Sequence, residues 1–145
     1  MSQSMNDLPS TIKYPGAFKA SLPAGYNGIF DWAFLLPIFE GTKIEPMDID
    51  GLVERHGRIL IFETKQPDKD IPMGQVGALE TLLRLGRGFV CIMVLYGKSA
   101  TAITGIEEWH YIKGRISKSA RKTCDSLYVK ERVNAWFSWA NKELI

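Results

Sequence analysis

The chain has 145 residues, a length that predicts one domain with a substantial hydrophobic core. Hydrophobic residues make up 46% and charged residues 23% of the sequence, which is ordinary for a soluble globular protein. The formal net charge is only +2, so the chain as a whole does not attract a polyanion such as a nucleic acid. Any nucleic-acid contact must therefore come from a local patch.

Membrane and secretion signals are missing from the sequence. No stretch of about 18 apolar residues occurs, so we expect no transmembrane helix and no membrane partner. The N-terminus lacks the basic start and the apolar run of a signal peptide. Cys91 and Cys124 have no metal-ligand spacing, and reduced thiols in a cytoplasmic protein are the expectation.

The first part of the chain is rich in residues that interrupt regular structure. Residues 1–25 contain three prolines and two glycines, which favours an N-terminal arm laid over the domain. Residues 26–40 are dense in aromatic and aliphatic side chains. They predict a short buried helix or an irregular core segment that ends near Pro37 and Gly41.

Two strands joined by a tight turn come next. Residues 44–54 and 58–66 are the predicted strands, and the second is apolar on both faces, as expected for an interior strand. Gly57 supplies the positive φ that a tight hairpin needs, with His56 as the other loop residue.

This hairpin brings charged side chains together. With a two-residue loop, Asp50 lies opposite Glu63, and Asp48 lies opposite Lys65. Paired residues project from one face roughly 5 Å apart, and alternation places Glu63 and Lys65 on that same face. Facing carboxylates repel each other, and a divalent cation between them would remove the conflict. The pattern predicts a metal site, with Asp50 preferred and Asp48 as the alternative.

A crossover follows the hairpin. An apolar pattern with helical spacing begins after Pro72 and ends at Gly86 or Gly88; it is formed by Val76, Leu79, Leu82 and Leu83. Residues 89–96 are a continuous apolar run of strand length. Strand, helix and strand in this order predict a βαβ unit, with 89–96 parallel to 58–66.

The last third combines a further strand, a basic stretch and a helix. We expect a strand at 100–106 and a helix at 127–143 with one apolar face. The loop between them, 112–123, has no acidic residue and five basic ones, Lys113, Arg115, Lys118, Arg121 and Lys122. It predicts contact with a phosphate backbone, and the neighbouring aromatic residues at 109–111 could stack on unpaired bases. A solvated basic loop is the alternative.

The order of these features resembles the PD-(D/E)XK nuclease superfamily over roughly residues 44–96. Asp50 stands for the acid of the first strand, Glu63-Thr64-Lys65 for the E-x-K motif and Gln75 for the glutamine of the following helix. That helix is similar to the one in VRR-NUC and Holliday-junction-resolvase-like members. The family's proline directly before the first acid is displaced, because Met47 and Asp48 follow Pro46.

The resemblance implies an α/β, restriction-endonuclease-like core with a mixed central sheet flanked by helices. It implies a divalent-metal-dependent endodeoxyribonuclease of DNA replication, recombination or repair, with structured or branched DNA as a candidate substrate. The implied catalytic residues are Asp50, Glu63, Lys65 and Gln75. The implied ligands of Mg²⁺ or Mn²⁺ are Asp50, Glu63 and the carbonyl of Thr64.

Some alternatives stay open at this point. The family often takes one more acid from its N-terminal helix; Asp31 is preferred for this role over Glu40 and Glu45. A homodimer would supply two sites for two DNA strands, with the arm and the C-terminal helix as interface. The competing function is a non-catalytic nucleic-acid-binding or assembly module that keeps the nuclease fold.

Overall fold

The structure is a computed structural model that describes residues 30–142. By its internal contacts the chain divides into two units, Met1–Pro46 and Met47–Ile145. The predicted N-terminal arm, residues 1–25, lies outside the described residues.

The first unit contains one described helix, the 3₁₀ helix η2 at Ala33–Phe39. The prediction of a buried segment is wrong, because no residue of η2 is buried and Phe34 is 66% exposed. Phe30 packs instead against the ring of Trp32, with centroids 4.5 Å apart. After η2 the chain turns at Gly41, whose φ of 83° favours glycine.

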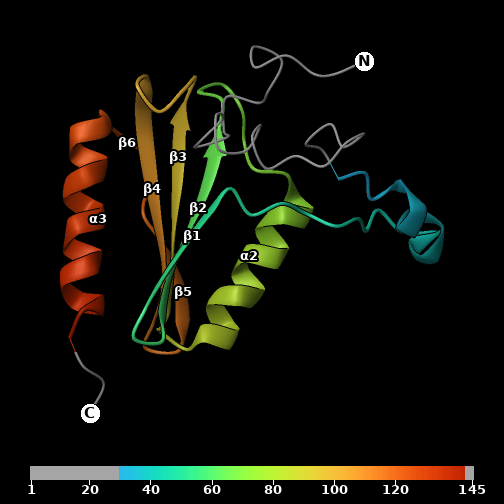
Figure 1. The fold of residues 1–145 in the computed structure, drawn as a ribbon, viewed down its shortest axis with the longest axis horizontal. Helices are drawn as coiled ribbons and strands as arrows, with labels where there is room; N and C mark the ends of the chain where they lie inside the picture. The colour runs from blue at the N-terminus through green and yellow to red at the C-terminus, as the bar shows by residue number, and fades with distance from the viewer. Residues whose placement is uncertain (1–29, 143–145) are drawn as a thin grey trace, which may run out of the picture. The chain divides into compact units, whose positions relative to one another are not determined.

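The second unit is built on a mixed sheet (Figure 1), which in the described part of the chain has six strands. Five follow one another in the order β1-β2-β3-β4-β5, and β6 pairs with β4. The strands are β1 Gly51–Arg55, β2 Arg58–Lys65, β3 Val90–Gly97, β4 Ile103–Ile112, β5 Arg115–Lys118 and β6 Lys122–Thr123. Strands β2 and β3 are parallel, as the crossover predicts, and the other pairs are antiparallel.

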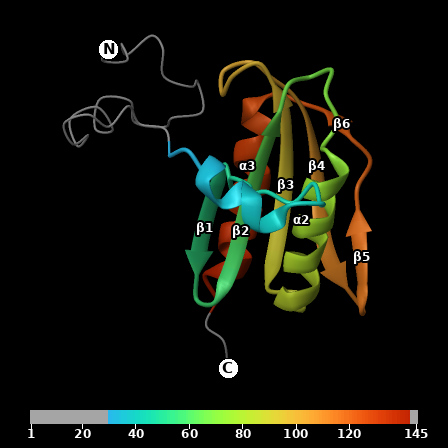
Figure 2. The same ribbon diagram turned by 90° about the vertical axis from the view of Figure 1, so that its right-hand side faces the viewer.

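Two helices cover opposite faces of this sheet (Figures 1 and 2): α2 at Met73–Gly86 and α3 at Ser126–Ala140. The α2 face buries one apolar cluster, formed by Ile61, Leu79, Leu83, Val90, Ile92, Val94, Tyr96 and Trp109. The α3 face buries a second one, formed by Leu60, Cys91, Met93, Ile106, Val129, Trp136 and Ala140. Alternate residues of β2 and β3 enter the two clusters, which explains why both faces are apolar in residues 59–62 of β2 and along β3.

Several element boundaries differ from the predicted ones. Strand β1 begins at Gly51 rather than at residue 44, and β4 runs from Ile103 to Ile112 rather than over 100–106. Helix α3 ends at Ala140, short of the predicted 143. Helix α2 ends at Gly86, as predicted, and the next residue, Arg87, is left-handed with φ 49°.

The predicted basic loop at 112–123 is wrong, because β4 continues into it and β5 and β6 follow. Lys113 and Gly114 have φ values of 52° and 76°, and they close a two-residue hairpin turn. Ile116 then packs against the cluster on the α2 face. The many charged residues of this stretch favoured the prediction of a loop, although one apolar residue, Ile116, faces the core.

The sheet with its two helices makes the second unit an α/β structure, as predicted. Within residues 30–142, no helix has the length and apolar character needed to cross a membrane.

Candidate active site

The β1–β2 hairpin has the predicted register. Gly51 pairs with Phe62 at one end, and Arg55 pairs with Arg58 at the loop. His56 and Gly57 form the loop, and both have positive φ, 52° and 80°. This geometry is that of the turns that favour tight hairpins. The ladder places the chain just before β1 beside the end of β2.

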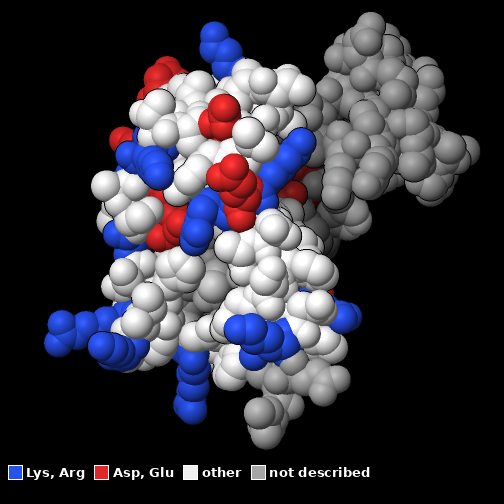
Figure 3. Space-filling model, turned by 90° about the vertical axis from the view of Figure 1, so that its left-hand side faces the viewer, with Lys and Arg blue, Asp and Glu red and all other residues white. Residues whose placement is uncertain are grey.

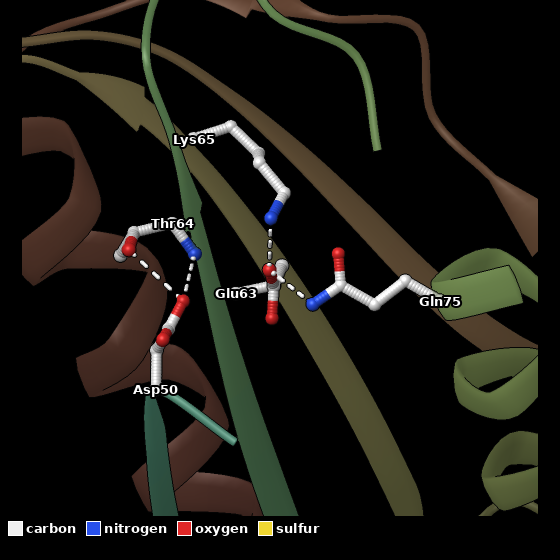
Figure 4. A network of polar contacts seen from close by, with 5 residues as sticks. All are labelled: Asp50, Glu63, Thr64, Lys65 and Gln75. Carbon is white, nitrogen blue, oxygen red and sulfur yellow. Dashed lines mark hydrogen bonds and ion pairs between the residues drawn. The ribbon is translucent and has the colours of Figure 1, made fainter. Parts of the chain in front are cut away.

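Asp50 lies at this point and closes the hairpin with its side chain. Its Oδ2 accepts hydrogen bonds from the backbone N–H of Thr64 at 2.8 Å and from the Thr64 hydroxyl at 2.9 Å (Figure 4). The predicted pairing therefore changes in detail, because the ladder ends at Gly51 and Asp50 bonds to Thr64 rather than facing Glu63 directly.

Glu63 is the buried acid of the site. It projects from the α2 face of β2 and is only 1% exposed. Its Oε1 is 2.7 Å from the Lys65 ammonium and accepts a hydrogen bond from Gln75 Nε2 at 2.9 Å. Figure 4 shows Lys65 and Gln75 reaching this carboxylate from two sides. Strand β2 supplies Glu63 and Lys65, and the first turn of α2 supplies Gln75.

The surroundings of Glu63 act on its charge in opposite directions. Burial raises its pKa above the ordinary 4.5, and the negative charge of Asp50 raises it further. The contacts with Lys65 and Gln75 lower the pKa, but the net shift is upward. The fold thus holds a carboxylate in a place that disfavours its charged form. Such groups are common at functional sites, although structural ion pairs produce them too.

Metal-binding capacity rests on two carboxylates. Asp50 and Glu63 each use one oxygen in the contacts above; neither Asp50 Oδ1 nor Glu63 Oε2 accepts a hydrogen bond from a described residue. Among residues 30–142, no group of three or more His, Cys, Asp or Glu side chains could hold a metal ion. Two carboxylates with water and phosphate oxygens match the usual ligation of Mg²⁺.

The other predicted acids have different surroundings. Asp48 is exposed, and among the described residues the ion-pair partner of Lys65 is Glu63 rather than Asp48. Asp31 belongs to the first unit, where its Oδ1 accepts a hydrogen bond from Ala33 N–H at 2.9 Å, at the start of η2. Glu40 and Glu45 are exposed residues of the same unit.

Two polar residues that the sequence analysis did not single out share the α2 face with Glu63. Tyr96 pairs with Lys65 across the parallel ladder, and Glu107 on β4 pairs with Val94, the partner of Glu63. The Tyr96 hydroxyl donates a hydrogen bond to Glu107. Their signal in the sequence was a tyrosine at the end of the apolar run of β3 and one of two adjacent glutamates in β4.

Arg121 stands over this pair. Its guanidinium lies 3.4 Å from the Tyr96 ring centroid and donates to the Pro67 carbonyl at 3.0 Å. The side chain crosses Gly105, where an added Cβ would lie only 3.2 Å from Arg121 Cγ. Gly105 thus leaves the space that Arg121 occupies beside the end of β2.

The other four predicted nucleic-acid-binding residues are divided: Arg115 and Lys118 line one pocket beside α2, whereas Lys113 and Lys122 do not line it. Lys113 lies in the β4–β5 turn, and Lys122 donates to the Tyr128 hydroxyl at 3.1 Å, near α3.

On the α3 face, Lys and Arg side chains dominate the lower half, the end that carries the β1–β2 and β4–β5 turns (Figure 3). The acidic side chains of that face gather in the upper half (Figure 3).

No protein-family model matches the chain, and neither do any curated protein sequences or solved structures.

Proposed function

We propose that this chain is a divalent-metal-dependent endodeoxyribonuclease with a restriction-endonuclease-like core, acting in DNA replication, recombination or repair. The observation that carries the proposal is the buried Glu63 carboxylate, held between Lys65 and Gln75 on one side of β2 while Asp50 closes the hairpin beside it. The ordered PD-(D/E)XK-like sequence pattern supports the same assignment.

The donor set fits a hard divalent cation. The open oxygens of Asp50 and Glu63, with the Thr64 carbonyl, would hold Mg²⁺ or Mn²⁺, and waters and phosphate oxygens would complete the coordination. A bound ion of this kind supplies charge neutralisation at the phosphate and a water of lowered pKa. Its charge would also offset the burial cost of the Glu63 carboxylate.

Lys65 and Gln75 have separate roles in the proposal. The Lys65 side chain is 21% exposed, so its ammonium is both paired with Glu63 and accessible to a substrate phosphate or an attacking water. Gln75 is a positioning residue, because its amide holds Glu63 Oε1 and thereby fixes how the carboxylate is oriented.

The test is cleavage of a DNA panel by the full chain, with and without Mg²⁺ or Mn²⁺. The panel contains single-stranded, nicked, flapped and four-way DNA. We expect metal-dependent cleavage that falls by about 100-fold or more in Glu63→Gln, Lys65→Met and Asp50→Asn proteins. Asp48→Asn is the matched control for Asp50→Asn, and Glu131→Gln on the exposed side of α3 controls for net charge. Undiminished cleavage by folded Glu63→Gln protein would refute the proposal.

A non-catalytic nucleic-acid-binding module is the second candidate. The observation that favours it is that the polar groups already satisfy one another, Glu63 with Lys65 and Asp50 with Thr64. Calorimetric titration with Mn²⁺ separates the two functions. The nuclease requires a site that disappears in the Asp50→Asn protein, whereas the binding module shows no such site.

A homodimer is part of the nuclease proposal, because two sites can cut two strands. Trp136 is buried in the core, whereas Phe137 on α3 is 45% exposed and available for an interface. Sedimentation of the full chain with and without four-way DNA tests the dimer.

A further inference from the structure

A groove of about 640 Å³ lies on the α2 side of the sheet, away from the candidate active site. Its walls come from the C-terminal half of α2 and from the β4–β5 hairpin, which lie side by side in Figure 2. The side chains that matter for its chemistry are Glu80, Arg84, Tyr111, Arg115 and Lys118.

Positive charge exceeds negative charge in this groove. Three cations and a single carboxylate line it. Glu80 is shared between Arg84 at 3.8 Å and Lys118 at 3.5 Å, distances at the long end of ion pairing. Among the described residues, Arg115 has no acidic partner within ion-pair distance. An entering anion can therefore take over contacts that Glu80 satisfies only weakly.

One further cation, Arg121, continues from Lys118 toward the chain after β2, where it donates to the Pro67 carbonyl. The Lys118 ammonium lies 4.0 Å from the Trp109 ring centroid, as the Arg121 guanidinium lies over Tyr96. Both rings belong to the core cluster of the α2 face, the face from which Glu63 projects. The intervening chain stays beside β4, where Ser119 N–H donates to the Glu108 carbonyl at 3.0 Å.

The cations follow the course of β4. Arg115 pairs with Ile112 and Lys118 pairs with Trp109, and both basic residues line the groove. Arg121 comes just before Lys122, the partner of Ile106, so the segment runs along about five residues of β4, roughly 17 Å or about five steps of a DNA strand. Such a row of separated cations suits a polyanion of repeating charge better than a single small anion.

We propose that the groove binds the sugar–phosphate backbone of a DNA strand and that Lys118 and Arg121 lead this strand toward Glu63. Arg84 and Arg115 would contact phosphates through their planar guanidinium groups. Tyr111, which is half-buried in the wall, offers a ring edge to a sugar or a base. The proposal that the DNA runs from the groove to Glu63 rests on the proposed nuclease function. The proposal that the groove binds DNA does not depend on it.

The test measures binding without cleavage. Fluorescence anisotropy of a labelled 20-base-pair duplex is recorded with the full chain in EDTA over a range of salt concentrations. We expect the Arg84→Gln/Arg115→Gln double variant to bind about 10-fold more weakly. Its slope of log K against log salt should be about 1.8 smaller, because each lost phosphate contact removes about 0.9.

The matched control is Arg55→Gln/Lys130→Gln, which removes the same charge from two exposed positions on β1 and α3. Three outcomes would each overturn the inference. These are an equal loss of duplex affinity in the two double variants, unchanged affinity of the groove variant, and no duplex binding by the wild type. The nuclease proposal fails separately, if the wild type binds DNA through the groove but cleaves none of the DNA panel with metal.

Discussion

At the residue scale, the buried Glu63 carboxylate of the candidate active site is unfavourable for the stability of the fold. A carboxylate that is 1% exposed loses nearly all its hydration, and one ammonium and one amide replace the water. Asp50 adds a second negative charge nearby, which raises the Glu63 pKa further. A purely structural design would place an apolar residue here, since the surrounding cluster is apolar.

The raised pKa of Glu63 predicts how stability depends on pH. The folded state keeps the proton at pH values where the unfolded chain has already released it, above the ordinary pKa of 4.5. The contribution of Glu63 is therefore fully present below this value and is lost as the pH rises through the raised pKa. We expect the free energy of unfolding of wild type relative to Glu63→Gln to fall as the pH rises from the ordinary pKa of 4.5 through the raised pKa of Glu63.

Urea unfolding at several pH values without metal measures this difference. Glu131→Gln, an exposed glutamate on α3, is the charge-matched control and should show no such trend. A wild type that gains stability over Glu63→Gln as the pH rises would contradict the prediction, because it would require a lowered pKa.

At the scale of the element, β2 organises the second unit. Its C-terminal end carries Glu63 and Lys65, and its N-terminal end carries Arg58, which is 8% exposed. The Arg58 Nη1 donates to the carbonyls of Trp139 at 2.9 Å, Ala140 at 3.1 Å and Lys142 at 2.6 Å. These groups at the end of α3 have no partner within the helix, so one guanidinium joins β2 to α3.

We therefore expect Arg58→Met to lower the free energy of unfolding by about 2–4 kcal/mol, because methionine keeps the apolar stem but removes the donor to the buried Ala140 carbonyl and to the part-buried carbonyls of Trp139 and Lys142. Arg55→Met is the control: Arg55 is exposed, and among residues 30–142 its side chain donates a hydrogen bond to the Asn141 side chain alone, at 2.8 Å. It should cost less than about 1 kcal/mol. Chemical denaturation compares the two, and equal effects would show that Arg58 does not anchor α3.

At the scale of the whole molecule, the candidate active site and the groove both lie in the second unit. Asp50, Glu63, Lys65 and Gln75 all follow Met47, where this unit begins. The sheet and the apolar clusters on its two faces are also complete within it. Asp31 is the one preferred site candidate that belongs to the first unit.

Residues Met47–Ile145, expressed alone, should fold cooperatively and keep most of the metal-dependent cleavage of the full chain. Circular dichroism and urea unfolding report the fold, and the DNA panel reports the activity. A shortened chain that folds but has lost cleavage would assign an essential group to the first unit, with Asp31→Asn in the full chain as the next comparison.

Local patterns accounted for the hairpin and the crossover. His56 and Gly57 define a two-residue loop, and the loop fixes the register of β1 and β2. The apolar run after α2 has the length of a buried strand, and the helix between the two strands carries the chain back, so that this strand runs parallel to β2. The prediction of a basic loop failed because hairpin pairing, not composition, decides the conformation of this stretch: Lys113 and Gly114 close a turn, and the partly buried Ile116 packs against the core.

The sequence by itself determined the α/β order of the second unit, the hairpin register and the identity of the charged residues near the end of β2, because these depend on spacing of a few residues. Only the tertiary structure decided which groups meet. Asp50 turns to Thr64, Gln75 reaches Glu63 from another element, and Arg121 lies over Tyr96. Such contacts depend on how β2, α2 and β4 pack, and packing joins residues whose separation along the chain carries no periodic signal.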